Sequence, residues 1–282
     1  MPANAGRGTA GAAVATSMAC RPAAVAMHHV AWCAVRLGGA RILPGRRTSG
    51  ALLDEAHRAI VDDVRRSVGR VDEVAVLVRR QATRRALLAL LLSDDRPIAF
   101  VKAVTGADVT GLRREQEALT AMAGTDSRPV VVPELLAVGT TGEWCWTAMT
   151  PLSARPHRPA WRCDAGAIAT WLQSRLQGAV ADPDVAAHWR PMHGDFAPWN
   201  LRKLLGGPLA LFDFEDARMA PPAADITYWH LTVAALRATP LREDADREAC
   251  AFWHTVVRDR LDAGTDPTMD QTLLQLLETT AR

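Results

Sequence analysis

Residues 192–200 read MHGDFAPWN, and residues 211–215 read LFDFE. Strand-like runs at residues 201–205 and 209–214 flank Gly206-Gly207, a pattern that predicts a tight β-hairpin. Because a tight hairpin returns its second strand beside the loop that precedes it, the polar residues of both stretches are expected to converge. The loop and the hairpin therefore predict one polar site at their junction.

The side chains expected to converge are Asp195, Asn200 and Asp213. Two carboxylates and an amide oxygen form the hard-oxygen site that Mg²⁺ prefers, although one carboxylate could instead act as a base toward a hydroxyl. Phosphoryl transfer requires both functions. One Asp orients and deprotonates the acceptor, while an Asn and a second Asp hold Mg²⁺ against the phosphates.

Phosphoryl transfer also needs a cation for the nucleotide phosphates, and Lys102 could supply it. Lys102 lies in the strand-like run 98–104, and Glu115 falls on the apolar face of the helix predicted over residues 108–122. An acid on a buried helix face needs a partner, because an unpaired buried charge is expensive. Since the only other lysine in the chain is Lys203, a Lys at this position is informative. We expect Lys102 and Glu115 to pair.

Together, HGDFAPWN and FDFE resemble the signature of the aminoglycoside phosphotransferase and choline kinase family, the small-molecule branch of the protein-kinase-like fold. The resemblance covers roughly residues 70–235. It implies an α+β fold of two lobes. The N-lobe would contain a small antiparallel sheet with one key helix, and the C-lobe would be mainly helical.

The resemblance also implies roles for individual residues. Asp195 would be the catalytic base, and Asn200 and Asp213 would be ligands of Mg²⁺. Lys102 would contact the phosphates of ATP, and Glu115 would hold Lys102 in place. The implied cofactors are therefore ATP and Mg²⁺.

Three further residues acquire supporting roles from the resemblance. His193 would be structural within the catalytic loop, and Asp225 would anchor that loop from the next helix. Met149 would belong to the hinge that faces adenine. Only eleven residues lie between Asp213 and Asp225, too few for the long activation segment of a protein kinase, so a small acceptor is expected.

Two features differ from the family pattern. Residues 81–84, between the first two predicted strands, contain no Gly where a Gly-rich phosphate loop would lie. Only about 40 residues separate the hinge from His193, where many antibiotic kinases carry larger helical insertions, which argues against an aminoglycoside acceptor. Near Asp213, Glu215 and Asp216 could bind a cationic acceptor, cap a helix or face solvent.

Periodicity and turn residues predict the order of the elements. Helices are expected at residues 51–68, 108–122, 165–177, 226–237, 244–261 and 269–280, and strands at 74–78, 87–92, 98–104, 135–138, 144–148, 201–205 and 209–214. This order gives a small antiparallel sheet with one helix, followed by a helical lobe that contains a hairpin.

The same order divides the chain into three parts. Residues 1–48 are rich in Ala, Gly and Arg and contain no acidic residue, so we expect a low-complexity, disordered extension. A transit peptide, or a start at Met18 or Met27, are the alternatives. Residues 49–149 would form the nucleotide-binding N-lobe, and residues 150–282 the C-lobe that binds the acceptor and carries the catalytic residues.

Composition excludes several classes of protein. The 282 residues are 49% hydrophobic and 23% charged, as in soluble globular proteins, and the formal net charge of +2 does not suggest a nucleic-acid partner. No run approaches the roughly 20 apolar residues of a membrane span. The five scattered cysteines form no CxxC pair and fit a reducing compartment. We expect a cytoplasmic protein with a small-molecule acceptor.

The predicted function is an ATP-dependent small-molecule kinase, a phosphotransferase that moves the γ-phosphoryl group of Mg·ATP to a hydroxyl. The acceptor could be an aminoglycoside-like antibiotic, an amino alcohol, a sugar or a biosynthetic intermediate. One alternative is a catalytically degenerate kinase-like protein that binds a nucleotide or a partner. Another is a metal-dependent hydrolase that uses His193, Asp195 and Asp213, in which Lys102 and Glu115 have no task.

Overall fold

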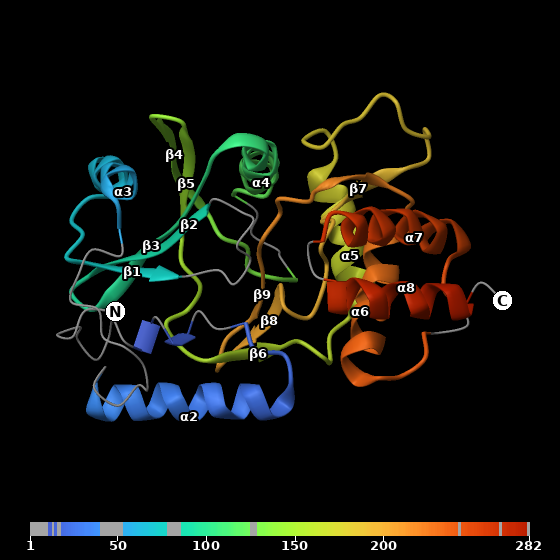
Figure 1. Ribbon diagram of the computed structural model, residues 1–282, viewed down its shortest axis with the longest axis horizontal. Coiled ribbons are helices and arrows are strands. Elements are labelled where there is room, and N and C mark those ends of the chain that lie inside the picture. Colours follow the sequence, from blue (N-terminus) through green and yellow to red (C-terminus); the bar gives the residue numbers. More distant parts are fainter. Residues whose placement is uncertain are drawn as a thin grey trace.

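The computed structural model describes residues 11–12, 14–15, 18–39, 53–77, 86–124, 129–241, 244–264 and 267–280. Two lobes lie side by side, one containing a sheet and the other mainly helical (Figure 1). The N-lobe sheet has five antiparallel strands in the order β1-β2-β3-β5-β4. Its strands are β1 (Glu73–Leu77), β2 (Ala86–Ser93), β3 (Arg96–Val104), β4 (Leu135–Thr141) and β5 (Trp144–Met149).

The two faces of this sheet have different partners, because successive side chains of a strand point to opposite faces. One face, which includes Val101, packs against α3 (Glu55–Val68) through Ile60. The opposite face includes Phe100 and Lys102, which line a cavity between the lobes. Alternation along β3 thus directs Lys102 toward the second lobe.

Helix α4 (Val109–Ala121), preceded by the short 3₁₀-helix η2 (Gly106–Asp108), connects the two lobes. Leu119 belongs to the same buried cluster as Phe214 of the C-lobe. Glu115 lies one turn before Leu119 on this buried side and is only 2% exposed. The helix therefore brings a carboxylate into the junction of the lobes.

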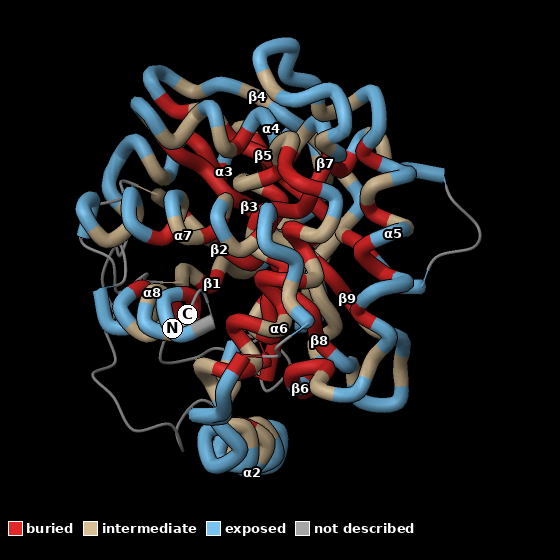
Figure 2. The backbone as a smooth tube through the Cα atoms, turned by 90° about the vertical axis from the view of Figure 1, so that its right-hand side faces the viewer, coloured by how far each residue is buried: buried red, intermediate tan, exposed pale blue. Residues whose placement is uncertain are grey.

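The C-lobe is built from helices and two small sheets. It contains β6 (His157–Pro159), α5 (Ala165–Leu176), β7 (Arg190–Met192), β8 (Leu201–Leu204), β9 (Leu209–Leu211), β10 (Arg218–Ala220), α6 (Ala224–Arg237), α7 (Arg247–Asp262) and α8 (Pro267–Thr280). The strands pair in the orders β6-β8-β9 and β10-β7. Buried residues follow the strands and α6, as Figure 2 shows.

Helix α2 (Pro22–Gly38) lies within residues 1–48, for which composition predicts disorder. The structure differs from that expectation over the helix. Val35 is fully buried, and the indole Nε1 of Trp32 donates a hydrogen bond to the carbonyl oxygen of Ala154 at 2.9 Å. The Ala-rich composition has high helix propensity, and the Gly and Pro residues stand at the ends of the helix, so the same residues form a helix once it docks.

The predicted elements are present among the described residues, with shifted ends. The hairpin forms from β8 and β9, but β9 ends at Leu211 and not at Phe214. Asp213 leaves the strand conformation with φ of 70°. Strands β6, β7 and β10 were not predicted, because three residues are too short to show alternation. Within the described part of the chain, no helix has the length and apolar character of a membrane span.

Candidate active site

The loop of residues 193–200, called the catalytic loop after the role expected of it, connects β7 to β8 and carries three of the predicted site residues, His193, Asp195 and Asn200. Gly194 has φ of 85°, a conformation that glycine adopts without steric cost. A Cβ atom at this position would clash with the backbone carbonyl of Asp216. The glycine therefore lets the loop lie directly against the residues that follow Asp213.

Asp225, in the first turn of α6, holds this loop through its backbone. Its Oδ2 accepts a hydrogen bond from the His193 N–H at 2.9 Å, and its Oδ1 accepts one from the Gly194 N–H at 3.4 Å. The side chain is fully buried, and burial raises the pKa of Asp225 to about 7 against the opposing effect of the two donors. The loop is thus tied to the core of the C-lobe.

His193 is also fully buried. Its Nε2 donates to the carbonyl oxygen of Phe212 at 3.1 Å, and its Nδ1 accepts from the backbone N–H of Asp195 at 3.2 Å. Burial lowers the pKa of His193 to about 4, so the ring is neutral near pH 7. The imidazole joins the catalytic loop to the segment that carries Asp213.

Asp195 is oriented by its neighbours in the loop. Its Oδ2 accepts hydrogen bonds from Trp199 Nε1 at 2.9 Å and from Asn200 Nδ2 at 2.7 Å. Burial raises the pKa of Asp195 to about 7, and the positive charge of Arg260 opposes this shift. A carboxylate whose pKa lies near the working pH is well matched to accept a proton.

A cluster of charges surrounds Lys102, which is 2% exposed. Its Nζ lies 3.0 Å from Glu115 Oε2, 2.8 Å from Asp213 Oδ1 and 2.6 Å from Glu215 Oε2. Burial opposes the charge of Lys102, but the three carboxylates raise the pKa of its ammonium group above the ordinary value. The structure thus brings together the predicted Lys102–Glu115 pair and Asp213, and it adds Glu215.

Glu115 links the two lobes through this cluster. Besides the ion pair with Lys102, its Oε1 accepts a hydrogen bond from the backbone N–H of Phe214 at 3.3 Å. Burial raises the pKa of Glu115 above the ordinary value, and Lys102 opposes the shift. Breaking a buried pair of this kind costs about 3–5 kcal/mol, because the remaining charge has no partner.

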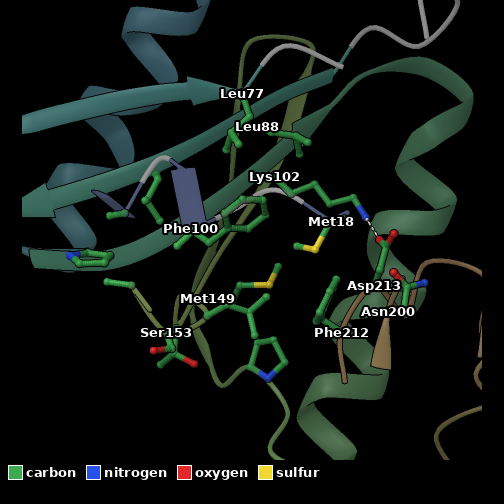
Figure 3. Close-up of a pocket in the computed structure, with 18 of the residues that line it drawn as sticks. Met18, Leu77, Leu88, Phe100, Lys102, Met149, Ser153, Asn200, Phe212 and Asp213 are labelled. Atoms are coloured by element: carbon green, nitrogen blue, oxygen red, sulfur yellow. Dashed lines mark hydrogen bonds and ion pairs between the residues drawn. The ribbon is translucent and has the colours of Figure 1, made fainter. Parts of the chain in front are cut away.

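The cavity between the lobes has a volume of about 530 Å³. Figure 3 shows Lys102 and Asp213 joined at one end, with Asn200 beside Asp213. Phe100 and the predicted hinge residue Met149, both apolar, lie away from this end. A charged end and an apolar end suit the phosphates and the base of a nucleotide.

The charged end of the cavity fits Mg²⁺. Asn200 Nδ2 is committed to Asp195, and its Oδ1 accepts no hydrogen bond from the described residues. Asn200 and Asp213 both line the cavity. Among the described residues, no group of three or more His, Cys, Asp or Glu side chains could hold a metal alone. Mg²⁺ usually takes one or two oxygen ligands from the protein and completes its shell with phosphates and water, so an amide oxygen and a carboxylate would suffice.

Arg260 of α7 is a neighbour of the catalytic loop that the motif did not reveal. Its Nη1 donates to the Tyr228 hydroxyl at 3.0 Å, and its Nη2 lies 3.5 Å from both Gly194 O and Asp216 Oδ2. Its guanidinium brings a positive charge near Asp195. Nothing in the sequence singles out this residue, because the chain is rich in Arg and Arg260 is distant from the motif.

Glu215 and the tryptophans near the motif also have defined positions. Trp199 lines the cavity, whereas Trp229 packs against Phe196 in the core with ring centroids 5.4 Å apart. Glu215 contacts Lys102, an outcome that the sequence left open. The Gly-free stretch 81–84 lies outside the described residues.

Comparisons with known proteins agree with this arrangement. Residues 158–263 match the model of the phosphotransferase enzyme family. The streptomycin–ATP–APH(2″)-IIa ternary complex is similar to this chain at 13% identity and a TM-score of 0.52, over 82% of this chain and 97% of that chain. Spectinomycin phosphotransferase APH(9)-Ia, in complex with ADP and spectinomycin, is similar at 8% identity and a TM-score of 0.51, over 79% and 98%. A search of curated proteins found no match.

At these identities the solved structures show the fold alone. The matched segment contains residues 193–200, Asp213 and Asp225, and Lys102 of the N-lobe lies 2.8 Å from Asp213. Residues 158–263 therefore match the phosphotransferase enzyme family, and the chain has a two-lobed, protein-kinase-like fold similar to that of the aminoglycoside phosphotransferases.

Proposed function

We propose that the chain is an ATP-dependent kinase that moves the γ-phosphoryl group of Mg·ATP to a hydroxyl of a small molecule. The observation that carries this proposal is the meeting of Lys102, Asn200 and Asp213 at one end of a ligand-sized cavity. Asp195 is hydrogen-bonded to Asn200 at the same place. The residues that would bind the phosphate donor therefore lie next to the residue that would accept the proton.

The charged end of the cavity would bind the phosphates. Lys102, held by Glu115, would contact phosphate oxygens. Asn200 Oδ1 and the Asp213 carboxylate would hold Mg²⁺, which neutralises phosphate charge when bound. The apolar end, with Phe100 and Met149, would receive the base.

Asp195 would act as the base. Because Trp199 and Asn200 both donate to Oδ2, Oδ1 is the atom left to accept the proton of the acceptor hydroxyl. The acceptor oxygen forms a bond to the γ-phosphorus as the bond to the bridging oxygen breaks, and ADP leaves. Because hydrogen-bond donors already hold the Asp195 carboxylate in place, the loop would rearrange little during this step.

The hydrolase alternative fits less well. Both ring nitrogens of His193 are already used within the fold, which leaves neither to bind a metal. The short segment between Asp213 and Asp225 supports a small acceptor, such as an antibiotic, an amino alcohol, a sugar or a biosynthetic intermediate. All five cysteines are free, which supports a cytoplasmic location.

The test is the thermal unfolding midpoint with and without Mg·ATP. A ligand that binds only the folded state raises the midpoint, so ATP with Mg²⁺ should raise the midpoint of the wild type. Asp213→Asn should lose the Mg²⁺-dependent part of the shift, and Asp195→Asn should keep it. An acceptor screen by ADP release then follows.

Two results would contradict the proposal. If saturating Mg·ATP left the wild-type midpoint unchanged, the chain would have no such nucleotide site. If the nucleotide bound but Asp195→Asn released ADP as fast as the wild type with an identified acceptor, the base would be another group.

A further inference from the structure

Described residues near the start of the chain reach the cavity between the lobes. Ala12, Ala15 and Met18 line it, and together they are called the N-terminal wall below. Ala12 and Ala15 are each 2% exposed, and Ala12 packs in one cluster with Leu90 of β2. In Figure 3, Met18 lies in the cavity between Phe100 and Phe212.

The N-terminal wall is anchored to the C-lobe by Arg202 of β8. This guanidinium is fully buried, and its Nη2 donates to the carbonyl oxygen of Ala19 at 2.9 Å. Its other hydrogen bonds go to His157 Nδ1 at 2.9 Å, Pro198 O at 3.3 Å, His157 O at 3.5 Å and Cys20 Sγ at 3.7 Å. No carboxylate of the described residues pairs with Arg202. Burial lowers the pKa of Arg202 to about 10, and Cys20, the residue after Ala19, opposes this shift.

A second anchor lies beyond Met18. The indole Nε1 of Trp32, in α2, donates to the carbonyl oxygen of Ala154 at 2.9 Å. Ala154 follows the predicted hinge and itself lines the cavity. The segment is therefore held on both sides of Met18, by the sheet face at Ala12 and by the hinge region and β8 after it.

The size of the cavity shows whether the N-terminal wall leaves room for a ligand. With Met18 in place, about 530 Å³ remains, within the roughly 300–1,000 Å³ of pockets that hold small molecules. The side chain of Met18 is apolar and flexible, and Phe100 and Met149, which line the same cavity, are also apolar. A flat aromatic base is the part of a nucleotide that such groups contact favourably.

We propose that the N-terminal wall is part of the nucleotide site and that Met18 is a specificity-determining contact of the nucleoside. This proposal rests on the proposed function, since it assigns a contact to the same donor. It adds to the site a segment from outside the two lobes, supplied by residues that composition places in a disordered extension.

The experiment measures ADP and GDP affinity by calorimetry on the full chain. Met18→Ala removes the contact and should weaken ADP binding about three- to tenfold, the range expected for a partly buried methionine contact. Met18→Trp puts a larger side chain into the cavity and should weaken ADP binding further. The ratio of ADP to GDP affinity should change in both variants.

Met27→Ala is the matched control, because Met27 is 74% exposed on α2 and does not line the cavity. It should bind both nucleotides as the wild type does. The unfolding midpoint without nucleotide should be equal in all four proteins, which separates lost contact from lost fold.

Each other outcome overturns the proposal in a different way. Unchanged affinity in Met18→Ala would remove Met18 from the site. Tighter ADP binding in Met18→Ala would make the segment an obstruction and not a wall. No ADP binding by the wild type would refute the proposed function itself, and with it the wall.

Discussion

Replacement of Lys102 by Met tests the charge cluster most directly. The substitution keeps the length of the side chain but removes the cation within 3.0 Å of Glu115, Asp213 and Glu215. Because Glu115 is buried, leaving its charge without a partner should lower the free energy of unfolding of the protein by about 3–5 kcal/mol near neutral pH. Asp213 and Glu215 are more exposed, at 30% and 17%, and contribute less because water screens them.

The loss should depend on pH with a defined sign. Without Lys102, the folded-state pKa of Glu115 rises further above its unfolded value of 4.5. A carboxyl group with a raised folded pKa takes up a proton on folding between the two values, so the penalty grows as pH rises through that window. The variant should therefore be closer to the wild type at about pH 5 than at about pH 8.

Urea unfolding of Lys102→Met at both pH values provides the measurement. Lys203→Met is the matched control, because Lys203 is exposed and its Nζ donates to Gly207 O at 2.8 Å. The control should stay within about 0.5 kcal/mol of the wild type. Adding Glu115→Gln to Lys102→Met should restore part of the loss. Equal free energies of unfolding for Lys102→Met and Lys203→Met at both pH values would refute the buried charge cluster.

The other predictions concern turnover. Asp195→Asn should lower kcat by about 10²–10⁴, measured as ADP release, with nucleotide binding retained. Because the pKa of Asp195 lies at about 7 and the base must be ionised, wild-type turnover should fall as pH drops below that value. Arg260→Met should move this acid limb to higher pH, whereas the exposed control Arg258→Met should not. A uniform loss at every pH would limit Arg260 to a structural role. Gly194→Ala should clash with Asp216 and lower both turnover and the unfolding midpoint, and a midpoint equal to that of the wild type would contradict the close approach.

The parts of the site that the sequence predicted are those set by local geometry. Alternation along a strand directs Lys102 to one face, and helical periodicity puts Glu115 on the buried side of α4. The turn at Gly206 returns β9 beside the catalytic loop, so Asp213 comes near Asn200. Each of these relations depends on neighbours within a few residues or on one hairpin.

The parts that the sequence did not predict depend on packing between distant segments. Arg260 reaches Gly194 only because α7 packs against the loop, and Met18 reaches the cavity only because its segment docks on β8. Glu215 turns toward Lys102 after the chain leaves β9 with Asp213 in a left-handed conformation. Propensity and periodicity carry no information about such contacts.

The contrast between the two lysines offers a route to covalent labelling. Lys203 is exposed on the β8–β9 hairpin, whereas Lys102 is 2% exposed and held as an ammonium ion by three carboxylates. An acylating reagent attacks only an accessible, unprotonated amine, so of the two it should modify Lys203 in the folded chain. A fluorophore attached there would report from the lobe that holds the catalytic loop, and acylation of Lys102 would record each opening of the junction between the lobes.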